Sequence, residues 1–194
     1  MKKIAAWLLW VALAGLSGQE LSAQGRAQPE QAALSLPAEL QQFQPTLALR
    51  GRSTLTFLGM DIYEARLWTA PAFALEKFEQ HPFALELQYR RSLTGRLIAR
   101  RSLAEMQRQS GFDPQRANAW LAQMESLFPD VKQGERITGI YLPDAGARFV
   151  VNGQPVGEIA DPLFARLFFG IWLSAQTSEP AMRCALAVCP SWQP

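Results

Sequence analysis

The segment DPLFARLFFGIWLS, residues 161–174, narrows the possible folds most, because it predicts a helix that is apolar on nearly every side. Asp161 and Pro162 favour a helix start, since the carboxylate can accept N–H groups of the first turn and proline fits the first helical position. Nine of the thirteen residues after Asp161 are large apolar residues, aromatic residues or alanine. A membrane span needs about 20 apolar residues and tolerates a central arginine such as Arg166 badly. We therefore expect this helix to be buried within the protein.

Short segments rich in β-forming residues supply a partner for this helix. Residues 46–51, 53–59 and 60–70 are separated by glycines and predict consecutive strands joined by tight turns. Residues 83–93 alternate between apolar and polar side chains, which predicts a strand with one apolar face and one wet face. Residues 135–143 and 147–159 predict further strands, and Asn152-Gly153 favours a type I′ hairpin turn.

The period changes to a helical one over residues 94–110, which Gly111 stops, and again from Asp113-Pro114 to residue 128, which Pro129 ends. A last helix is expected after residues 177–180, with Thr177 or Ser178 as its cap. Strands and helices grouped in this order indicate an α+β fold with a mainly antiparallel sheet and helices on one face. The apolar face of the sheet is the expected partner of the helix at 161–174.

The first residues predict a secretory signal peptide over residues 1–23. Lys2 and Lys3 precede an apolar run that extends to about residue 16, and small residues follow, with cleavage expected after Ala23 or near Gly18. An uncleaved anchor is the alternative reading, whereas no lipobox cysteine supports a lipoprotein. Residues 24–45 are rich in Gln, Ala and Pro and predict a flexible arm before a domain at 46–194. We expect a bacterial protein of the periplasm or a secreted one.

The charge balance narrows the class of partner. The formal net charge is +2, and removing Lys2, Lys3 and Glu20 with the signal lowers it by one. A nearly neutral chain without a stacking motif is not expected to bind nucleic acid. Five arginines form a dense basic patch that predicts either peripheral contact with anionic lipids or a solvated face paired with acidic neighbours; they are Arg90, Arg91, Arg96, Arg100 and Arg101. No signal for an oligomeric state is present.

Cys184 and Cys189 lie near the carboxyl end, and in an exported protein such a pair predicts a disulfide that closes a small loop. A bridge requires the helix to end between them, which the following Pro190 favours; two free thiols are the alternative. The only histidine, His81, precedes a proline in a predicted loop, far in sequence from both cysteines. We therefore expect no metal site, and we expect no cofactor.

Four segments together resemble the chalcone isomerase-like family, particularly its exported bacterial branch. The resemblance covers residues 46–187 in order and rests on LRGRSTLTFLGMDIYEARLW, LELQYRRSLTGRLIARRSL, LFPDVKQGERITGIYLPDAGARFVVNGQPVGEI and FARLFFGIWLSAQTSEPAMRCAL. It implies an open-faced β-sandwich, in which a curled antiparallel sheet packs against a layer of helices with a cleft between them. In the plant enzymes the cleft binds a flavonoid precursor, and in related non-catalytic members it holds a fatty acid.

The resemblance also implies ligand-binding positions. Arg50 matches an arginine that contacts the anionic group of the ligand, and Tyr63 ends the second strand of the motif. Hydroxyl-bearing and amide positions of the enzymes are replaced, which removes the polar network that cyclisation needs; the replacements are Leu58, Ile98, Glu105 and Gly170. Tyr63 and Tyr89 are read either as ligand contacts or as core residues with satisfied hydroxyls.

Three functions follow from this pattern. The first is an exported, non-catalytic domain that binds an apolar carboxylate such as a fatty acid, with Arg50 as anchor; the candidate ligand-binding residues are Arg50, Tyr63, Ile98 and Glu105. The second is an isomerase or lyase in which Arg50 works with Glu105 or Tyr63. The third is an interaction module whose cleft is filled by aromatic side chains such as Phe168, Phe169 and Trp172.

Overall fold

A computed structural model describes residues 35–43 and 46–189. The predicted signal peptide and residues 24–34 of the predicted arm lie outside the described residues. Residues 35–43 belong to the segment predicted as a flexible arm, but they pack against the sheet, and Leu40 has no exposed surface. The packed part of the chain therefore includes residues before the predicted domain start at residue 46.

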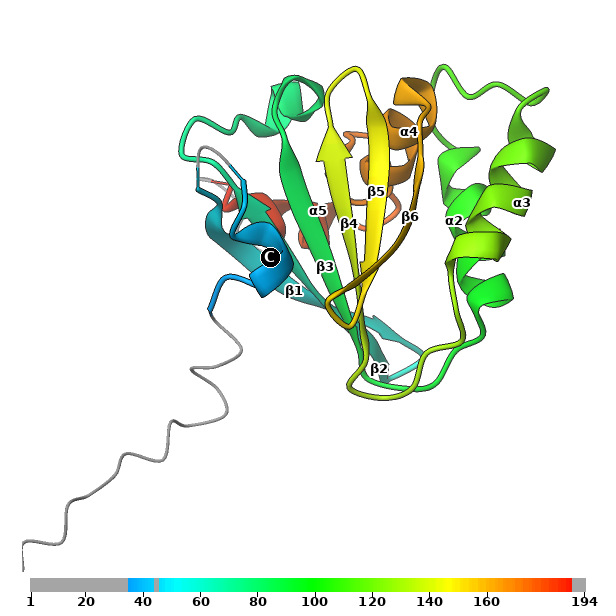
Figure 1. The fold of residues 1–194 in the computed structure, drawn as a ribbon, viewed down its shortest axis with the longest axis horizontal. Coiled ribbons are helices and arrows are strands. Elements are labelled where there is room, and N and C mark those ends of the chain that lie inside the picture. Colours follow the sequence, from blue (N-terminus) through cyan, green and yellow to red (C-terminus); the bar gives the residue numbers. More distant parts are fainter. Residues whose placement is uncertain (1–34, 44–45, 190–194) are drawn as a thin grey trace, which may run out of the picture. The chain divides into compact units, whose positions relative to one another are not determined.

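A six-stranded antiparallel sheet forms the centre of the fold, and each strand pairs with the next one in sequence (Figure 1). Short hairpins join the first strand to the second and the last three strands to one another, whereas residues 70–82 join the second to the third and residues 90–135, which include two helices, join the third to the fourth. The strands are β1 (Ala48–Phe57), β2 (Met60–Thr69), β3 (Phe83–Tyr89), β4 (Arg136–Leu142), β5 (Gly146–Val151) and β6 (Gln154–Ile159).

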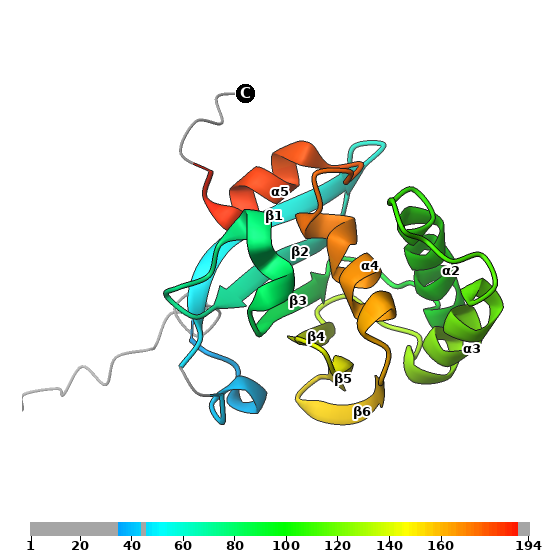
Figure 2. The same ribbon diagram turned by 90° about the horizontal axis from the view of Figure 1, so that it is seen from above.

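The helices cover one face of this sheet, which we call the inner face. Figure 2 shows α4 across the middle of that face, with α5 on one side of it and α2 and α3 on the other. The fold is therefore α+β with a curled antiparallel sheet, as the sequence predicts. The helices are α2 (Gly95–Met106), α3 (Ala117–Leu127), α4 (Pro162–Leu173) and α5 (Pro180–Ala187), with 3₁₀ turns η1 (Ala38–Leu40) and η2 (Leu75–Gln80).

Helix α4 begins where the sequence predicts it. Asp161 accepts hydrogen bonds from the backbone N–H groups of Leu163 and Phe164, at 2.9 and 3.1 Å, and from the indole N–H of Trp120 at 2.9 Å. Burial acts to raise the pKa of Asp161, but the bonds from Trp120 and Phe164, the charge of Arg116 and the bond from Leu163 together lower it. The helix is buried on most sides, as its composition requires.

Gly51 was predicted to separate two strands, but it lies within one strand. Residues 46–51 and 53–59 do not form two strands, because β1 runs through Gly51, which is in register with Leu67. A side chain at Gly51 would collide with the carbonyl oxygens of Ala185 and Leu186 in α5. Gly51 therefore allows a helix to approach the sheet closely instead of ending a strand.

The predicted hairpin turn at Asn152-Gly153 is confirmed. Asn152 has φ of 49° and Gly153 has φ of 83°, the positive values that a type I′ turn requires. A second turn of this kind joins β1 to β2 through Leu58 and Gly59, with φ of 49° and 75°.

Several helix ends differ from the prediction. Helix α2 ends at Met106, not Ser110, since the side chain of Gln109 turns inward and donates to the carbonyl oxygen of Leu167 at 2.6 Å. Helix α3 begins at Ala117, because Asp113 initiates a turn by accepting from the N–H of Gln115 at 3.0 Å.

The last helix, α5, begins at Pro180, and Thr177 accepts from the N–H of Glu179, just before the helix. It ends at Ala187, and Val188 takes a left-handed conformation with φ of 57°. Because the helix ends between the two cysteines, Cys184 and Cys189 join in a disulfide with a Cα–Cα distance of 4.9 Å. The structure thus has the bridge and not the two free thiols.

Apolar clusters lie on both faces of the sheet. The inner cluster joins strand residues such as Leu67, Phe83 and Phe149 to the helix layer. The cluster on the opposite face, which we call the outer face, is smaller; it contains Leu40, Leu47, Trp68, Ala70, Ala84, Ile140 and Val150. The outer side of β3 was expected to be wet, but Glu86 on that side is only 2% exposed.

Candidate functional site

Two tyrosines lie side by side on the inner face, one within β2 and one at the end of β3. Tyr63 on β2 is in register with Tyr89 on β3, and their rings meet edge to face with centroids 6.0 Å apart. Tyr89 is 2% exposed and Tyr63 is half-buried. The strand pairing therefore brings two phenol groups to one place under the helix layer.

A tryptophan of α4 completes this group. The indole N–H of Trp172 donates to the hydroxyl oxygen of Tyr63 at 3.0 Å, which links the last turn of α4 to β2. Tyr63 accepts in this bond, so its own hydroxyl proton remains available to a further acceptor. Tyr89 lies beside it, and its hydroxyl forms no hydrogen bond with the residues that the structure describes. Two phenol donors are thus left without a protein acceptor in the described chain.

Both phenols are held in the neutral form. Burial raises the pKa of Tyr63 well above its usual value; the bond from Trp172 opposes this, and the charges of Glu179 and Glu105 add to it. Burial also raises the pKa of Tyr89. The two hydroxyls therefore keep their protons throughout the physiological range and can act as hydrogen-bond donors.

Helix α2 brings charged groups toward the tyrosines. Glu105 is 9% exposed and pairs with Arg101 at 2.6 Å and Arg108 at 3.4 Å. The charge of Glu105 raises the pKa of Tyr63 and the charge of Arg101 lowers it. Ile98 lies two turns before Glu105 on the same helix and is half-buried against the inner cluster. Ile98 thus packs in the helix–sheet interface, and Glu105 acts electrostatically on Tyr63.

Arg50 lies elsewhere. The register pairs Tyr63 with Leu55, so Arg50 is five residues farther along β1. Its side chain is exposed and its Nε donates to the carbonyl oxygen of Ala187 at 3.2 Å, at the end of α5. The structure therefore brings Arg50 to neither Tyr63 nor Glu105. Arg101 is instead the arginine that pairs with Glu105 and whose charge acts on Tyr63.

Other positions suggested by the resemblance are spread out. Leu58 is not within a strand but in the β1–β2 turn, where it is 80% exposed. Gly170 is buried in α4 against the side chain of Gln109. His81 follows η2 and packs near Phe73, at the opposite end of β3 from Tyr89. No arrangement of nucleophile and base is formed by these residues.

Acidic residues, histidines and cysteines form no group that could hold a metal ion in the part of the chain that is described. In the same part, no helix has the length and the apolar character needed to cross a bilayer.

Comparison with known proteins assigns this arrangement to a family. The profile of chalcone isomerase-like proteins matches residues 28–186. The chain belongs to the chalcone isomerase-like family. The match starts before residue 46, in agreement with the packing of residues 35–43 on the sheet.

Two proteins similar to this chain illustrate the family. An uncharacterized protein of Haemophilus influenzae is 28% identical over 99 residues, which are 51% of this chain and 48% of that protein, so the match spans about half of the relative. The crystal structure of the Arabidopsis thaliana fatty-acid binding protein AtFAP1 gives a TM-score of 0.59 at 14% identity, and the match covers 75% of this chain and 88% of that one. At this identity the likeness establishes the fold.

Aromatic rings fill the middle of the interface in this chalcone isomerase-like fold. Phe169 has no exposed surface and meets Phe83 and Tyr141 edge to face, at 5.1 and 5.5 Å. Phe168 packs against Phe149 at 5.3 Å. Aromatic packing thus occupies the middle of the interface, and the phenol hydroxyls of Tyr63 and Tyr89 lie toward one end of it.

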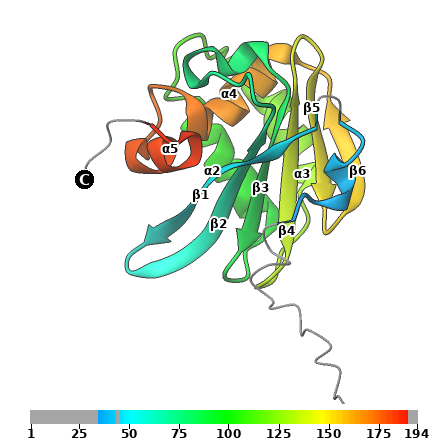
Figure 3. The ribbon, with the colours of Figure 1, turned by 90° about the vertical axis from the view of Figure 1, so that its left-hand side faces the viewer.

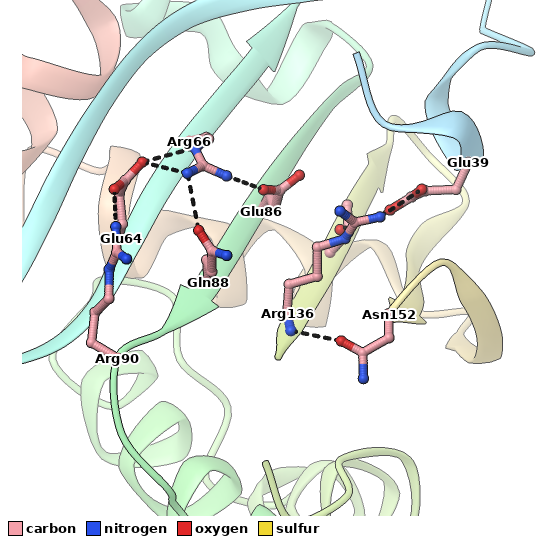
Figure 4. Close-up of polar contacts among 9 residues, drawn as sticks. Glu39, Glu64, Arg66, Glu86, Gln88, Arg90, Arg136 and Asn152 are labelled. Carbon is pink, nitrogen blue, oxygen red and sulfur yellow. Dashed lines mark hydrogen bonds and ion pairs between the residues drawn. The ribbon is translucent and has the colours of Figure 1, made fainter. Parts of the chain in front are cut away.

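The outer face of the chalcone isomerase-like sheet carries a second polar group (Figure 4). Arg66 on β2 reaches Glu64 and Glu86, each at 2.7 Å, and donates to Gln88 at 3.1 Å; Arg90 also pairs with Glu64. Burial acts to raise the pKa of Glu64, but the charge and hydrogen bonds of Arg66 and Arg90 lower it. Two arginines thus balance two glutamates in this network.

Residues of η1 extend the polar contacts toward β4. Glu39 accepts from Thr138 at 3.3 Å and pairs with Arg136 at 3.5 Å. Among the described residues, Glu86 Oε2, Arg136 Nε and Trp68 Nε1 are buried without a hydrogen-bond partner. Because protein groups satisfy most of its charges, we interpret the outer network as structural and the Tyr63–Tyr89 group as the candidate site.

The sequence and the resemblance named Arg50, Tyr63, Ile98 and Glu105 as candidate ligand-binding residues, which stay predictions. Two residues that interact with Tyr63 in the structure were not among these candidates. Trp172 was noted only as a side chain that could fill the cleft, and Arg101 only as part of a basic patch. Trp172 lies 109 residues from Tyr63, so no local pattern could reveal their hydrogen bond.

Proposed function

We propose that this protein binds an apolar ligand with an acidic head, such as a fatty acid, between the sheet and helices α2 and α4. One observation carries the proposal: the hydroxyl of Tyr89 is unpaired among the described residues and lies beside Tyr63, whose proton is also free. A charged ligand oxygen could accept from both phenols, and hydrogen bonds to a charged group are stronger than neutral ones. The phenols would therefore receive the head group.

The surrounding residues suit such a ligand. Arg101 would balance the negative charge of a carboxylate, since it already lies close enough to act on Tyr63. Ile98, Leu103 and Met106 present apolar side chains from α2 to the same interface. The name of AtFAP1, a fatty-acid binding protein with this fold, supports the ligand class.

Arg50 remains a prediction from the resemblance. Only its Nε is engaged by Ala187, so the rest of its guanidinium is available to an anion at the end of β1. A ligand held there would not reach the tyrosines with the same head group, because five residues of strand separate the two places. We therefore assign the head group to Tyr63 and Tyr89 and keep Arg50 as the variant that distinguishes the two anchors.

The test is native mass spectrometry of the protein with a series of saturated fatty acids of about 12 to 18 carbons, each added at the same concentration. We compare the wild type with Tyr63→Phe/Tyr89→Phe and with Arg50→Gln. Tyr141→Phe is the matched control, because its hydroxyl donates to the backbone of Glu79 at the other end of the sheet. Phenylalanine preserves the ring packing in each of the tyrosine variants.

We expect bound fatty acid in the wild type, in Arg50→Gln and in Tyr141→Phe. The double variant should bind at least about tenfold more weakly, since a hydrogen bond to a charged group contributes about 1.5–3 kcal/mol. Binding by the wild type should also persist to about pH 10, because the raised pKa values keep both phenols protonated. Loss of the ligand in Arg50→Gln alone would return the anchor to Arg50, and no binding by the wild type would end the proposal.

One observation favours the interaction module as a second candidate. Phe168, Phe169 and Trp172 are buried and pack face to edge, so much of the interface is occupied by the protein itself. An absence of ligand in every variant, together with capture of one protein partner by the wild type, would support this function.

We also propose that the protein is exported through a cleaved signal at residues 1–23. The disulfide between Cys184 and Cys189 supports this, because such bonds persist mainly in oxidising compartments. The test is the mass of the protein recovered from the periplasm and medium of an expressing bacterium. A mass without the first 23 residues is expected, and an intact amino terminus in the cytoplasm would contradict export.

A further inference from the structure

The tip of the β1–β2 hairpin exposes three large apolar side chains. Phe57 is 62% exposed, Leu58 is 80% exposed and Met60 is 43% exposed. In Figure 3 this hairpin projects beyond the rest of the sheet. Half of the exposed large apolar residues in the described chain are therefore gathered at one projecting tip.

The turn makes this exposure costly in two ways. Leu58 adopts φ of 49°, a conformation in which asparagine or glycine would be less strained than leucine. The side chain of Leu58 also contributes almost nothing to the core, because four fifths of its surface faces solvent. Leucine at this position does not stabilise the fold. It would stabilise binding to a partner surface that buries the tip.

Positive charge borders the tip. Arg91 contacts the sulfur of Met60 at 2.8 Å. The neighbouring face of α2 presents Arg96, Arg100 and Arg101, and Leu97 between them is 53% exposed. Arg91 lies four residues before the first residue of α2, so its contact with Met60 brings the start of that helix toward the tip.

The acidic neighbours do not cancel this charge. Glu125 is shared by Arg96 and Arg100, and Glu105 is shared by Arg101 and Arg108. Asp61 adds one further carboxylate near the turn and accepts from Thr56. Five arginines thus face three carboxylates; they are Arg91, Arg96, Arg100, Arg101 and Arg108.

We propose that the β1–β2 tip and the arginine face of α2 together dock the protein on an anionic phospholipid bilayer. Phe57, Leu58 and Met60 enter the boundary between head groups and acyl chains, and the arginines contact lipid phosphates. An anionic bilayer has an apolar interior beneath a negatively charged surface. Apolar side chains that project from a basic protein surface are complementary to it. This inference goes beyond ligand binding and does not rest on it.

The test is co-sedimentation with two kinds of vesicle, one of phosphatidylcholine alone and one in which about one third of the lipid is phosphatidylglycerol. The protein is used in the form recovered from the expressing cell. The tip variant is Phe57→Ser/Leu58→Asn. Its matched control is Val156→Ser/Val188→Asn, because Val188 is 59% exposed with φ of 57° and Val156 is also exposed, and neither lies in the hairpin. The charge variant is Arg96→Gln/Arg100→Gln, and its control is Arg148→Gln on β5.

We expect the wild type and both controls to bind the anionic vesicles and to bind the neutral ones weakly. The tip variant should bind at least about tenfold more weakly, since it removes two buried apolar side chains. Each arginine near the surface contributes about fivefold, and this effect should decrease with salt.

Three outcomes would overturn the proposal. These are no binding to anionic vesicles, equal binding by the tip variant and its control, and equal binding to neutral and anionic vesicles. The second outcome would assign any binding to another part of the chain, such as residues before 35. A dimer that dissociates in the tip variant, without vesicle binding, would identify a second copy as the occupant.

Discussion

On the inner face of the sheet the buried side chains beneath α4 are mainly aromatic, whereas the outer face buries Arg66 and Glu86 in an ion-paired network. Buried polar groups on the inner side mostly have partners, as with Gln109 and Trp172. Three of the four buried side-chain atoms without a partner in the described chain lie on the outer face, on Trp68, Glu86 and Arg136. We infer that ring packing holds the inner face, and that the outer face depends on charge balance.

This difference bears on function. An aromatic interface is tolerant of pH and salt. Its polar exception is Tyr63 with Tyr89, whose hydroxyl protons have no acceptor among the described residues. The outer charges already satisfy most of one another, so they are poor candidates for a ligand. The following predictions test whether the two faces really differ in this way.

The largest expected effect is on the inner face. Phe169→Ala should lower the free energy of unfolding by about 3–5 kcal/mol, because it removes a fully buried ring in contact with Phe83 and Tyr141. Urea denaturation followed by circular dichroism measures this. Phe57→Ala is the control, since Phe57 is 62% exposed, and it should change stability by less than about 0.5 kcal/mol. A cost below about 1.5 kcal/mol for Phe169→Ala would show that the interface is loosely packed.

The second effect is on the outer face. Arg66→Met should cost about 3 kcal/mol, because it leaves Glu86 buried without its cation. The double variant Arg66→Met/Glu86→Leu should recover most of this loss, since replacing both partners by apolar groups is often neutral. Arg52→Met is the control, because Arg52 lies opposite Arg66 in the register but is exposed. If the double variant is no more stable than the single one, charge balance is not what holds this face.

A third effect concerns the start of α4. Asp161→Ala should cost about 1–2 kcal/mol at pH 7, because it removes the cap of Leu163 and Phe164 and the acceptor of Trp120. The pKa of Asp161 is lowered in the folded state, so its contribution is present above the unfolded pKa and is lost as pH falls through the folded one. The difference between wild type and variant should therefore shrink in urea titrations below about pH 4. A difference that is constant down to pH 2 would mean that the charge of Asp161 adds nothing to the cap.

The sequence predicted much of this fold because its signals are local. The cap at Asp161 and the Asn152-Gly153 turn each follow from adjacent residues, and both are found where the sequence places them. The alternation of β3 correctly separated its two faces, but it could not show that Glu86 is buried. That burial depends on Arg66 from the neighbouring strand, and polar residues in a strand give no sign of which partner will cover them.

The candidate site was predicted less well, since it depends on distant parts of the chain. Tyr63 and Glu105 were named from the resemblance, and the charge of Glu105 acts on the pKa of Tyr63. Arg50 was also named, but the register of β1 with β2 moves it to α5. Residues of one strand are spread along it by about 3.3 Å per position. A motif in the sequence therefore cannot show that Arg50 and Tyr63 lie at different places in the structure.

The smallest expected effect is the loss of an exposed ion pair on the outer face, which can be compared with the loss of a buried one on the same face. Arg148 and Glu158 form an ion pair on the outer side of β5 and β6 at 3.2 Å, but their side chains are 59% and 60% exposed. Arg148→Gln should lower the free energy of unfolding by less than about 0.5 kcal/mol in urea, and the loss should vanish in about 0.5 M NaCl, because water and salt screen exposed charges. Arg66→Met breaks the same kind of pair in the same sheet, so the ratio of the two costs measures what burial adds. A cost for Arg148→Gln near that of Arg66→Met would mean that ion pairing itself, and not the burial of Glu86, explains why the outer face differs from the inner one.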